Sequence, residues 1–304
     1  MSGCRPAGEV SRGAGKGVTS VCVTDIDVPS CRSVSGDRSC CYEQTVTAGR
    51  EGCGSPALKL LTTEGMLVVK TLVIVGAGPG LGMGVARAFG GQGFRVGLVA
   101  RSKATLGALV DELAGLGVAA AAFPADIRDR DALVDALSTA EEQFGPVDVL
   151  EYSPSPTGPI TGAAQTTVVS ALAQFELHVL GAVTAVGHLL PQMRARGEGT
   201  LLLTTGVSSA IPAPFLANVG LAMAGLRNWA HALHAELRPQ GIHAATVTIA
   251  SGVIPGDKVA DPDAIGARYY SLYQHPDRVE EVVGDLNAFR DLVAKFAVGT
   301  ADPL

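Results

Sequence analysis

The sequence has few of the features that mark nucleic-acid, membrane or secreted proteins. Its 304 residues carry a formal net charge of −6 and no basic block, which argues against nucleic acid as a partner. Aromatic residues make up only 5%, too few to form platforms for base stacking. It has no uninterrupted run of about eighteen apolar residues, so we predict no membrane span. The start lacks the charged and apolar regions of a secretory signal, and we expect a cytoplasmic protein.

Cysteine is missing from the larger part of the chain. All six cysteines precede Met66, and their spacings do not resemble a paired zinc site, so we predict no metal site. Residues 1–65 are rich in Gly, Ser, Arg and Thr and have weak periodicity. We expect them to be a disordered extension, or Met66 to be the true start. The alternative is a small N-terminal module, with vicinal Cys40 and Cys41 as a metal or redox site.

From residue 66 onward, short apolar runs alternate with helix-length segments. Apolar residues make up 47% of the chain, enough for a large core. The runs are typical of strands covered on both faces, and a parallel sheet results when helices connect them. We therefore predict one α/β domain over 66–304, a doubly wound parallel sheet of Rossmann type. The expected strands lie near residues 67–77, 94–101, 118–126, 147–153, 200–206 and 242–250.

Two of the expected helices are unusually apolar. Val168–Arg196 and Phe215–Leu237 carry apolar residues on more than one face. A helix that is apolar nearly all round is buried on both sides. One side can cover the sheet, and the other is a candidate subunit interface. We therefore expect a homodimer or homotetramer formed through these helices.

A glycine-rich turn follows the first expected strand and opens a helix. In "GAGPGLG", Gly76, Gly80 and Gly82 fit a G-x-x-x-G-x-G spacing, with Leu81 between the last two, and Gly78 fits a second alignment. Glycine permits the tight turn and lets the backbone approach a pyrophosphate, while the helix N-terminus attracts the anion. The position between strand and helix predicts a dinucleotide site.

The end of the second expected strand bears on which dinucleotide binds. Folds that prefer NAD usually place a carboxylate there, to bind the ribose hydroxyls. This chain instead has Arg101, followed by Ser102. A guanidinium suits a 2′-phosphate, so we predict NADP(H) as the cofactor, unless Arg101 is merely a solvated surface charge.

With these motifs, the chain resembles the short-chain dehydrogenase/reductase family over about residues 67–250. Besides the glycine turn, "ADIRD" is similar to the family's acidic element after the third strand, which implies Asp126 beside the adenine ring and Ile127 in the site. "VDVLEYSPS" lies where the family has an Asn-Asn-Ala-Gly turn, which places Tyr152 and Ser153 at the cofactor. "HALHAELRPQGIHAATVTIASGVI" is similar to the family's late helix and sixth strand.

The resemblance fails at the catalytic residues. The family uses Ser, Tyr and Lys, with Tyr four residues before Lys, and often an Asn from the preceding long helix. Alignment on "AGLRNWA" puts Gly206, Val219 and Met223 at the Ser, Tyr and Lys positions, and His178 at the Asn position.

An alignment shifted by one residue gives Thr205, Asn218 and Ala222 instead, which restores neither Tyr nor Lys. The family's usual proton relay is therefore absent from the sequence in either alignment. Replacements must come from the same cleft.

Three residues are candidate replacements. His178 could exchange a proton near neutral pH, or be a core histidine bonded to a backbone carbonyl. Thr205 and Ser208 could orient a substrate oxygen, or satisfy the local backbone. Tyr152 is expected to line the cofactor rather than to transfer a proton.

Three further sets of residues each allow two interpretations. Asn218 could bind a ligand or cap its helix. His231 and His234 have a spacing that metals use, but lack a third ligand and are expected at a surface or interface. Residues 253–285 are expected to form a lid, in which a helix from Pro262 places Tyr269 and Tyr273 on one face, although packing at the domain edge is the alternative.

Three functions remain open on the sequence alone. The first is an NADP(H)-dependent oxidoreductase with a nonstandard proton donor, acting on a small-molecule carbonyl or enone. The second is a non-redox cyclase, dehydratase or isomerase on the same scaffold, since a fold does not fix a function. The third is a noncatalytic NADP-binding or scaffold protein.

Overall fold

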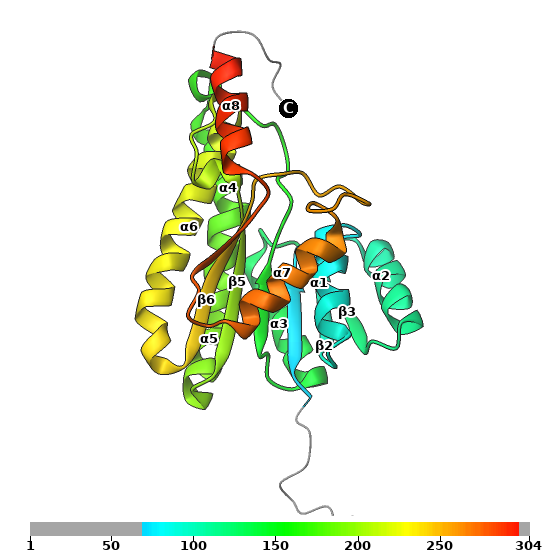
Figure 1. The fold of residues 1–304 in the computed structure, drawn as a ribbon. Helices are drawn as coiled ribbons and strands as arrows, with labels where there is room; N and C mark the ends of the chain where they lie inside the picture. The colour runs from blue at the N-terminus through cyan, green and yellow to red at the C-terminus, as the bar shows by residue number, and fades with distance from the viewer. Residues whose placement is uncertain (1–68, 298–304) are drawn as a thin grey trace, which may run out of the picture. The chain divides into compact units, whose positions relative to one another are not determined.

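The computed structural model describes residues 69–297, which form a seven-stranded sheet with every strand parallel to its neighbours (Figure 1). The strand order is β3-β2-β1-β4-β5-β6-β7. The strands are β1 (Thr71–Val75), β2 (Arg95–Ala100), β3 (Ala120–Pro124), β4 (Val149–Tyr152), β5 (Gly199–Gly206), β6 (Ile242–Ile249) and β7 (Glu280–Val283). The predicted Rossmann-type fold is confirmed. The expectations for residues 1–65 lie outside the described residues.

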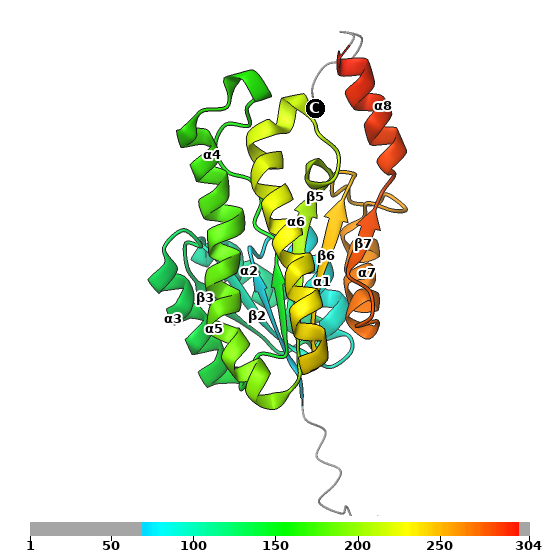
Figure 2. The same ribbon diagram turned by 90° about the vertical axis from the view of Figure 1, so that its left-hand side faces the viewer.

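Helices cover both faces of the sheet (Figures 1 and 2). One face carries α1 (Leu81–Gly90), α2 (Lys103–Gly115) and α7 (Pro262–Gln274), whose apolar residues share one core with the sheet. The other face carries α3 (Arg130–Phe144), α5 (Gly181–Arg196) and α6 (Ala217–Leu237), which share the second core. A last helix, α8 (Leu286–Ala297), packs through Phe289 on the segment that follows β5.

The predicted helix from Val168 to Arg196 is continuous but not uniform. It begins as α4 (Val168–Phe175), passes through a π-helical turn at Glu176–Leu180, and continues as α5. By length and composition alone this 29-residue segment could cross a membrane. A single such helix is weak evidence, because core helices pass the same test. In this structure α5 buries Ala182, Val186 and Leu189 in the core.

The region expected to form a lid includes the predicted helix, α7, but this helix does not cover the cleft. It docks on α1 at backbone distance: a Cβ added at Gly84 would lie 1.9 Å from the Pro262 carbonyl oxygen. A Cβ at Gly266 would lie 2.2 Å from the carbonyl oxygen of Gly84. Because only glycines allow this approach, α7 is a packed structural helix, with Tyr269 fully buried. The edge-packing alternative describes α7 better than the lid.

Candidate functional site

A cleft lies at the carboxyl ends of the strands, where ligands bind in such sheets. It consists of two adjoining cavities that share Gly76, Gly78 and Pro154. The outer cavity, of about 200 Å³, extends toward Arg101 and Asp126. The inner cavity, of about 430 Å³, lies between the glycine turn, the end of β5 and the start of α6. Together their lining residues extend from the end of the second strand to the end of the fifth.

The glycine turn forms the floor that both cavities share. Gly76 has φ +100°, and a Cβ there would lie 2.6 Å from the backbone nitrogen of Pro154. Gly76 and Ala77 both donate their N–H groups to the Val99 carbonyl oxygen, which fixes the turn. No side chain caps the start of α1 at Gly80. Gly80, Leu81 and Gly82 line the inner cavity, so the positive end of the helix faces the cleft.

Charged residues line the outer cavity. Arg101 is exposed on its wall, and Asp126, Ile127 and Arg128 lie on the wall too. A hydrogen-bonded pair with Arg128, 2.7 Å between Nη2 and Oδ2, lowers the pKa of Asp126 to about 2. Ser102, predicted at the cofactor, is not among the residues that line either cavity; its hydroxyl accepts from Thr105 N–H and caps α2.

Tyr152 and Ser153, the two residues predicted at the cofactor after the fourth strand, have different surroundings in the structure. Tyr152 is fully buried, and its hydroxyl donates to the Leu177 carbonyl oxygen at 2.5 Å. It therefore points into the core beneath α5, and its predicted place on the cleft wall is wrong. Ser153, the next residue, does line the inner cavity. The difference arises because successive side chains of a strand point to opposite faces.

The residues that the first sequence alignment puts at the family's Ser, Tyr and Lys positions lie at the inner cavity. Gly206, Val219 and Met223 line it. Asn218 does not: its side chain accepts from Thr161 N–H at 2.9 Å and donates to the Pro159 carbonyl oxygen at 3.0 Å. Of the second alignment's residues, Thr205 also lines the inner cavity, whereas Asn218 holds the loop before α4.

His178 does not reach the cleft. It lies in the π-helical turn, is 1% exposed, and lines neither cavity. Neither ring nitrogen has a hydrogen-bond partner among the described residues, so the backbone-bonded alternative is not seen either. Burial lowers the pKa of His178 to about 4, which keeps the ring neutral at neutral pH. In this structure it is a buried, uncharged side chain behind the cleft.

The two predicted hydroxyl residues do line the inner cavity. Thr205 lies at the end of β5, where its Oγ1 is 2.7 Å from Oγ1 of Thr248. Ser208 lines the inner cavity and also an adjoining apolar hollow along α6. Both remain candidates for holding a substrate oxygen.

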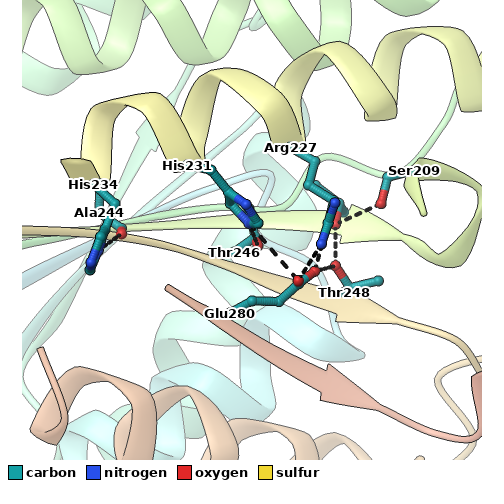
Figure 3. Close-up of polar contacts among 9 residues, drawn as sticks. Ser209, Arg227, His231, His234, Ala244, Thr246, Thr248 and Glu280 are labelled. Atoms are coloured by element: carbon teal, nitrogen blue, oxygen red, sulfur yellow. Dashed lines mark hydrogen bonds and ion pairs between the residues drawn. The ribbon is translucent and has the colours of Figure 1, made fainter. Parts of the chain in front are cut away.

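Behind Thr205 lies a network that we call the Arg227–Glu280 clamp. It comprises Arg227, Glu280, Thr248 and Ser209 (Figure 3), together with Thr205. The Arg227 guanidinium of α6 contacts both carboxylate oxygens of Glu280 on β7, at 2.8 and 2.5 Å. Thr248 donates to the same carboxylate at 2.6 Å. Arg227 and Thr248 hold the pKa of Glu280 below its usual value, against the effect of burial.

The two histidines of α6 lie beside the clamp rather than at a metal site. His231 contacts Oγ1 of Thr246 at 3.1 Å, and His234 contacts the Ala244 carbonyl oxygen at 2.9 Å (Figure 3). Within residues 69–297, no group of three metal-ligating side chains occurs. Both histidines help α6 to pack on β6.

The sequence analysis missed a second network, on the opposite face of the sheet. We call it the Glu151 network: Glu151, Ser153, Thr204 and Tyr269. Glu151 is fully buried in β4, and burial raises its pKa to about 8. The sequence contained a signal, because an acidic residue stands inside an otherwise apolar strand. A buried carboxyl group is rare unless it is paired or functional.

Comparison with known proteins assigns the fold to a family. The short chain dehydrogenase family matches residues 70–258, more than half of the chain. The chain belongs to the short-chain dehydrogenase family. A short chain dehydrogenase of Pseudocercospora fijiensis is 27% identical over 223 residues, which are 73% of this chain and 70% of the relative.

Solved structures of the family match at the level of the fold. A short-chain dehydrogenase from Rhodopseudomonas palustris superposes with a TM-score of 0.63 at 25% identity, over 71% of this chain and 98% of that one. A metagenomic short-chain oxidoreductase in complex with NADP superposes with a TM-score of 0.62 at 22% identity, over 70% of this chain and 96% of that one. At that identity, the second likeness indicates the fold alone.

Proposed function

We propose that this chain is an NADP(H)-dependent oxidoreductase that acts on a small-molecule carbonyl or enone with a proton donor other than the family's tyrosine. The observation that carries the proposal is the pair of adjoining cavities that share the glycine turn, one lined by Arg101 and the other by a set of hydroxyl side chains. Such a cleft combines an anion site, a site for a second phosphate and groups that can hold a carbonyl oxygen. These are the elements that hydride-transfer enzymes need.

The cleft fits a nicotinamide dinucleotide. A Cβ added at Gly78, which lines both cavities, would meet nothing within 4 Å, so the glycine turn leaves open space for a pyrophosphate beside the uncapped start of α1. Arg101 at the outer end is placed for a 2′-phosphate, and Asp126 for the adenine side. When bound, this cofactor supplies or accepts hydride.

The chain's own groups orient the substrate at the inner end. Thr205 and Ser208 offer hydroxyls, and Val219 and Met223 give that cavity an apolar wall. An apolar wall excludes water and strengthens the remaining polar contacts. The cavity therefore suits a small carbonyl compound with apolar substituents.

Nucleotide titration of Arg101→Glu tests the cofactor assignment. The dissociation constant for NADPH can be measured by tryptophan or NADPH fluorescence. It should rise at least about tenfold in the variant, a loss of about 1.4 kcal/mol of binding free energy, because repulsion replaces a guanidinium–phosphate contact. The constant for NADH should change little. Lys103→Glu is the matched control, since it makes the same charge change two residues away, outside both cavities. Binding of neither nucleotide by the unaltered protein would overturn the proposal.

A non-redox function is the second candidate, and the apolar residues Val219 and Met223 in the cleft favour it. A cyclase, dehydratase or isomerase would form product without consuming NADPH. Stoichiometric NADPH oxidation would exclude this function. A noncatalytic NADP-binding or scaffold protein would bind NADPH and transform no compound of a carbonyl and enone panel.

We further propose that the protein acts as a homodimer or homotetramer. Three helices, α4, α5 and α6, carry exposed apolar side chains, which belong to Val168, Val169, Leu172, Val183 and Leu221. Exposed apolar side chains in number are typical of protein interfaces. Leu221→Glu should weaken this interface and so lower the molecular mass measured by light scattering. Because Leu221 is 53% exposed, the change should not disturb the buried core of the protomer.

A further inference from the structure

We propose that Glu151 is the proton reserve of this cleft, and that its carboxyl group passes a proton through the Ser153 hydroxyl to the substrate oxygen. The inference rests on the proposed oxidoreductase function. It assigns the donor that the substituted positions Val219 and Met223 leave open.

The geometry forms a short path from the core to the cleft. The Ser153 hydroxyl lies 2.9 Å from Oε2 of Glu151, and the Thr204 hydroxyl lies 2.9 Å from Oε1. Thr204 Oγ1 is also 2.6 Å from the Tyr269 hydroxyl. Ser153 and Thr204 both line the inner cavity, whereas Glu151 and Tyr269 do not. One hydroxyl group therefore separates the buried carboxyl from the space where substrate binds.

The two hydroxyls differ in what they can still do. Thr204 Oγ1 donates to Glu151 and also contacts the Tyr269 hydroxyl, so its one proton is held inside the core. Ser153 Oγ has Glu151 as its one hydrogen-bond partner among the described residues. When the carboxyl is protonated it donates to Ser153 Oγ, and the Ser153 hydroxyl is then free to donate into the cleft. Ser153 is accordingly the relay and Thr204 the anchor.

The surroundings of Glu151 keep it protonated at neutral pH. Its neighbours on the adjacent strands, Ile74 on β1 and Leu202 on β5, are apolar. From α7 the titratable group that faces it is the Tyr269 hydroxyl, and within the described residues no cation contributes to its pKa. Burial raises that pKa to about 8, so the group holds a proton that it can release near physiological pH.

The proton transfer balances as a carbonyl reduction. A bound reduced dinucleotide would supply hydride to the carbonyl carbon, and the C=O π electron pair would move to the oxygen. That oxygen takes the Ser153 hydroxyl proton as Ser153 Oγ takes the proton of Glu151. The substrate is reduced, the dinucleotide is oxidised, and Glu151 is left as a carboxylate. Water in the open cleft returns the proton through Ser153 after product leaves.

Kinetics of Glu151→Gln test this path. The amide keeps the size and both hydrogen bonds of the neutral acid but cannot release a proton. With ethyl acetoacetate and 2-cyclohexenone as probes, kcat should fall about 10²- to 10⁴-fold, the range for loss of a general acid. KM and the NADPH dissociation constant should stay within about threefold. In the unaltered protein kcat should fall as pH rises through about 8, and this inflection should be absent from the variant.

Two further variants separate the relay from a structural role. Ser153→Ala should lose kcat to a similar degree and lose the same pH inflection, although Glu151 is intact. Asp148→Asn is the matched control, because Asp148 is a half-buried carboxyl just before β4, has a raised pKa, and bonds Thr71 N–H at 2.7 Å away from both cavities. Its pH profile should match that of the unaltered protein.

Infrared difference spectra of the full chain give a readout that needs no turnover. The C=O stretch of a protonated carboxyl group should vanish as pH rises through about 8 and be missing from Glu151→Gln. Absence of this band overturns the relay. So does turnover by Glu151→Gln with the unaltered rate and pH profile. Failure of the unaltered protein to oxidise NADPH with either probe overturns the proposed function itself, and the relay with it.

Discussion

Thr204 and Thr205 are neighbours in β5, yet each belongs to a different carboxyl network on a different face of the sheet. Thr204 contacts Glu151 and the Tyr269 hydroxyl of α7. Thr205 contacts Thr248, which donates to Glu280, the partner of Arg227 on α6 (Figure 3). Each network starts at a threonine that lines the cleft and contains one glutamate that accepts from a threonine hydroxyl.

What separates the networks is a cation. In the Arg227–Glu280 clamp a guanidinium contacts the carboxylate and holds the pKa of Glu280 below its usual value. In the Glu151 network burial acts without a cation, and the pKa of Glu151 rises to about 8. A charged pair fixes β7 against α6, whereas a neutral acid holds a proton next to the cleft. The two carboxyl groups therefore differ in protonation state because one has a cation beside it and the other has none among the described residues.

The largest effect that this comparison predicts is on stability in Glu151→Gln. The folded-state pKa of Glu151 is raised from 4.5 to about 8, so its neutral form stabilises the protein fully below pH 4.5. Between pH 4.5 and about 8, Glu151 ionises in the unfolded state but stays protonated in the folded state. The free energy of unfolding therefore falls by up to about 1.4 kcal/mol per pH unit as pH rises through this range. The variant should lack this loss and be the more stable protein at pH 8. Urea denaturation from pH 4 to 9 measures it.

Glu280→Gln is the matched control for that series. The pKa of Glu280 is lowered, so its contribution is present above the unfolded pKa and is lost as pH falls. This variant should therefore be less stable than the unaltered protein at neutral pH and approach it in acid. If the free energy of unfolding of Glu151→Gln and of the unaltered protein changed with pH in parallel, Glu151 would not be a neutral buried acid.

The second prediction removes the cation from the clamp. Arg227→Met leaves the Glu280 carboxylate mostly buried and without its ion pair, so the free energy of unfolding at pH 7 should fall by about 2 kcal/mol. Chemical denaturation measures the loss. The double variant Arg227→Met with Glu280→Gln should recover part of it, because the unpaired charge is gone. Equal stability of the single variant and the unaltered protein would show that the pair is a solvent-screened surface contact.

The sequence was sufficient to predict the fold and the shared floor of the cleft, because both depend on local patterns. Apolar runs and helix-length segments predicted the parallel sheet, and the glycine spacing predicted the turn that Gly76 makes against Pro154. The missed strand, β7, is a short edge strand that begins with two glutamates, so it lacks the apolar run that identified the others.

The cleft's side chains were harder to predict, because their direction depends on tertiary packing. Tyr152 turns into the core to reach the Leu177 carbonyl, and His178 lies in a π-helical turn that helical periodicity does not reveal. Glu151 was overlooked because the residues of its network come from three segments of the chain. One of them, Tyr269 on α7, is 118 residues away in the sequence. A resemblance to a family directs attention to the family's own catalytic positions, whereas Glu151 became visible only through the contacts of the structure.

The smallest predicted effect is at the far end of the Glu151 network. Tyr269→Phe removes a buried hydroxyl bonded to Thr204, which should cost about 1 kcal/mol of unfolding free energy. Because Thr204 can still donate to Glu151, and Ser153 is untouched, the pH dependence of both stability and kcat should keep the unaltered form. Thermal denaturation and a pH–rate profile measure the two parts separately. A shift of the inflection near pH 8 in this variant would mean that Tyr269 shares the proton, and the reserve would then comprise two groups rather than Glu151 alone.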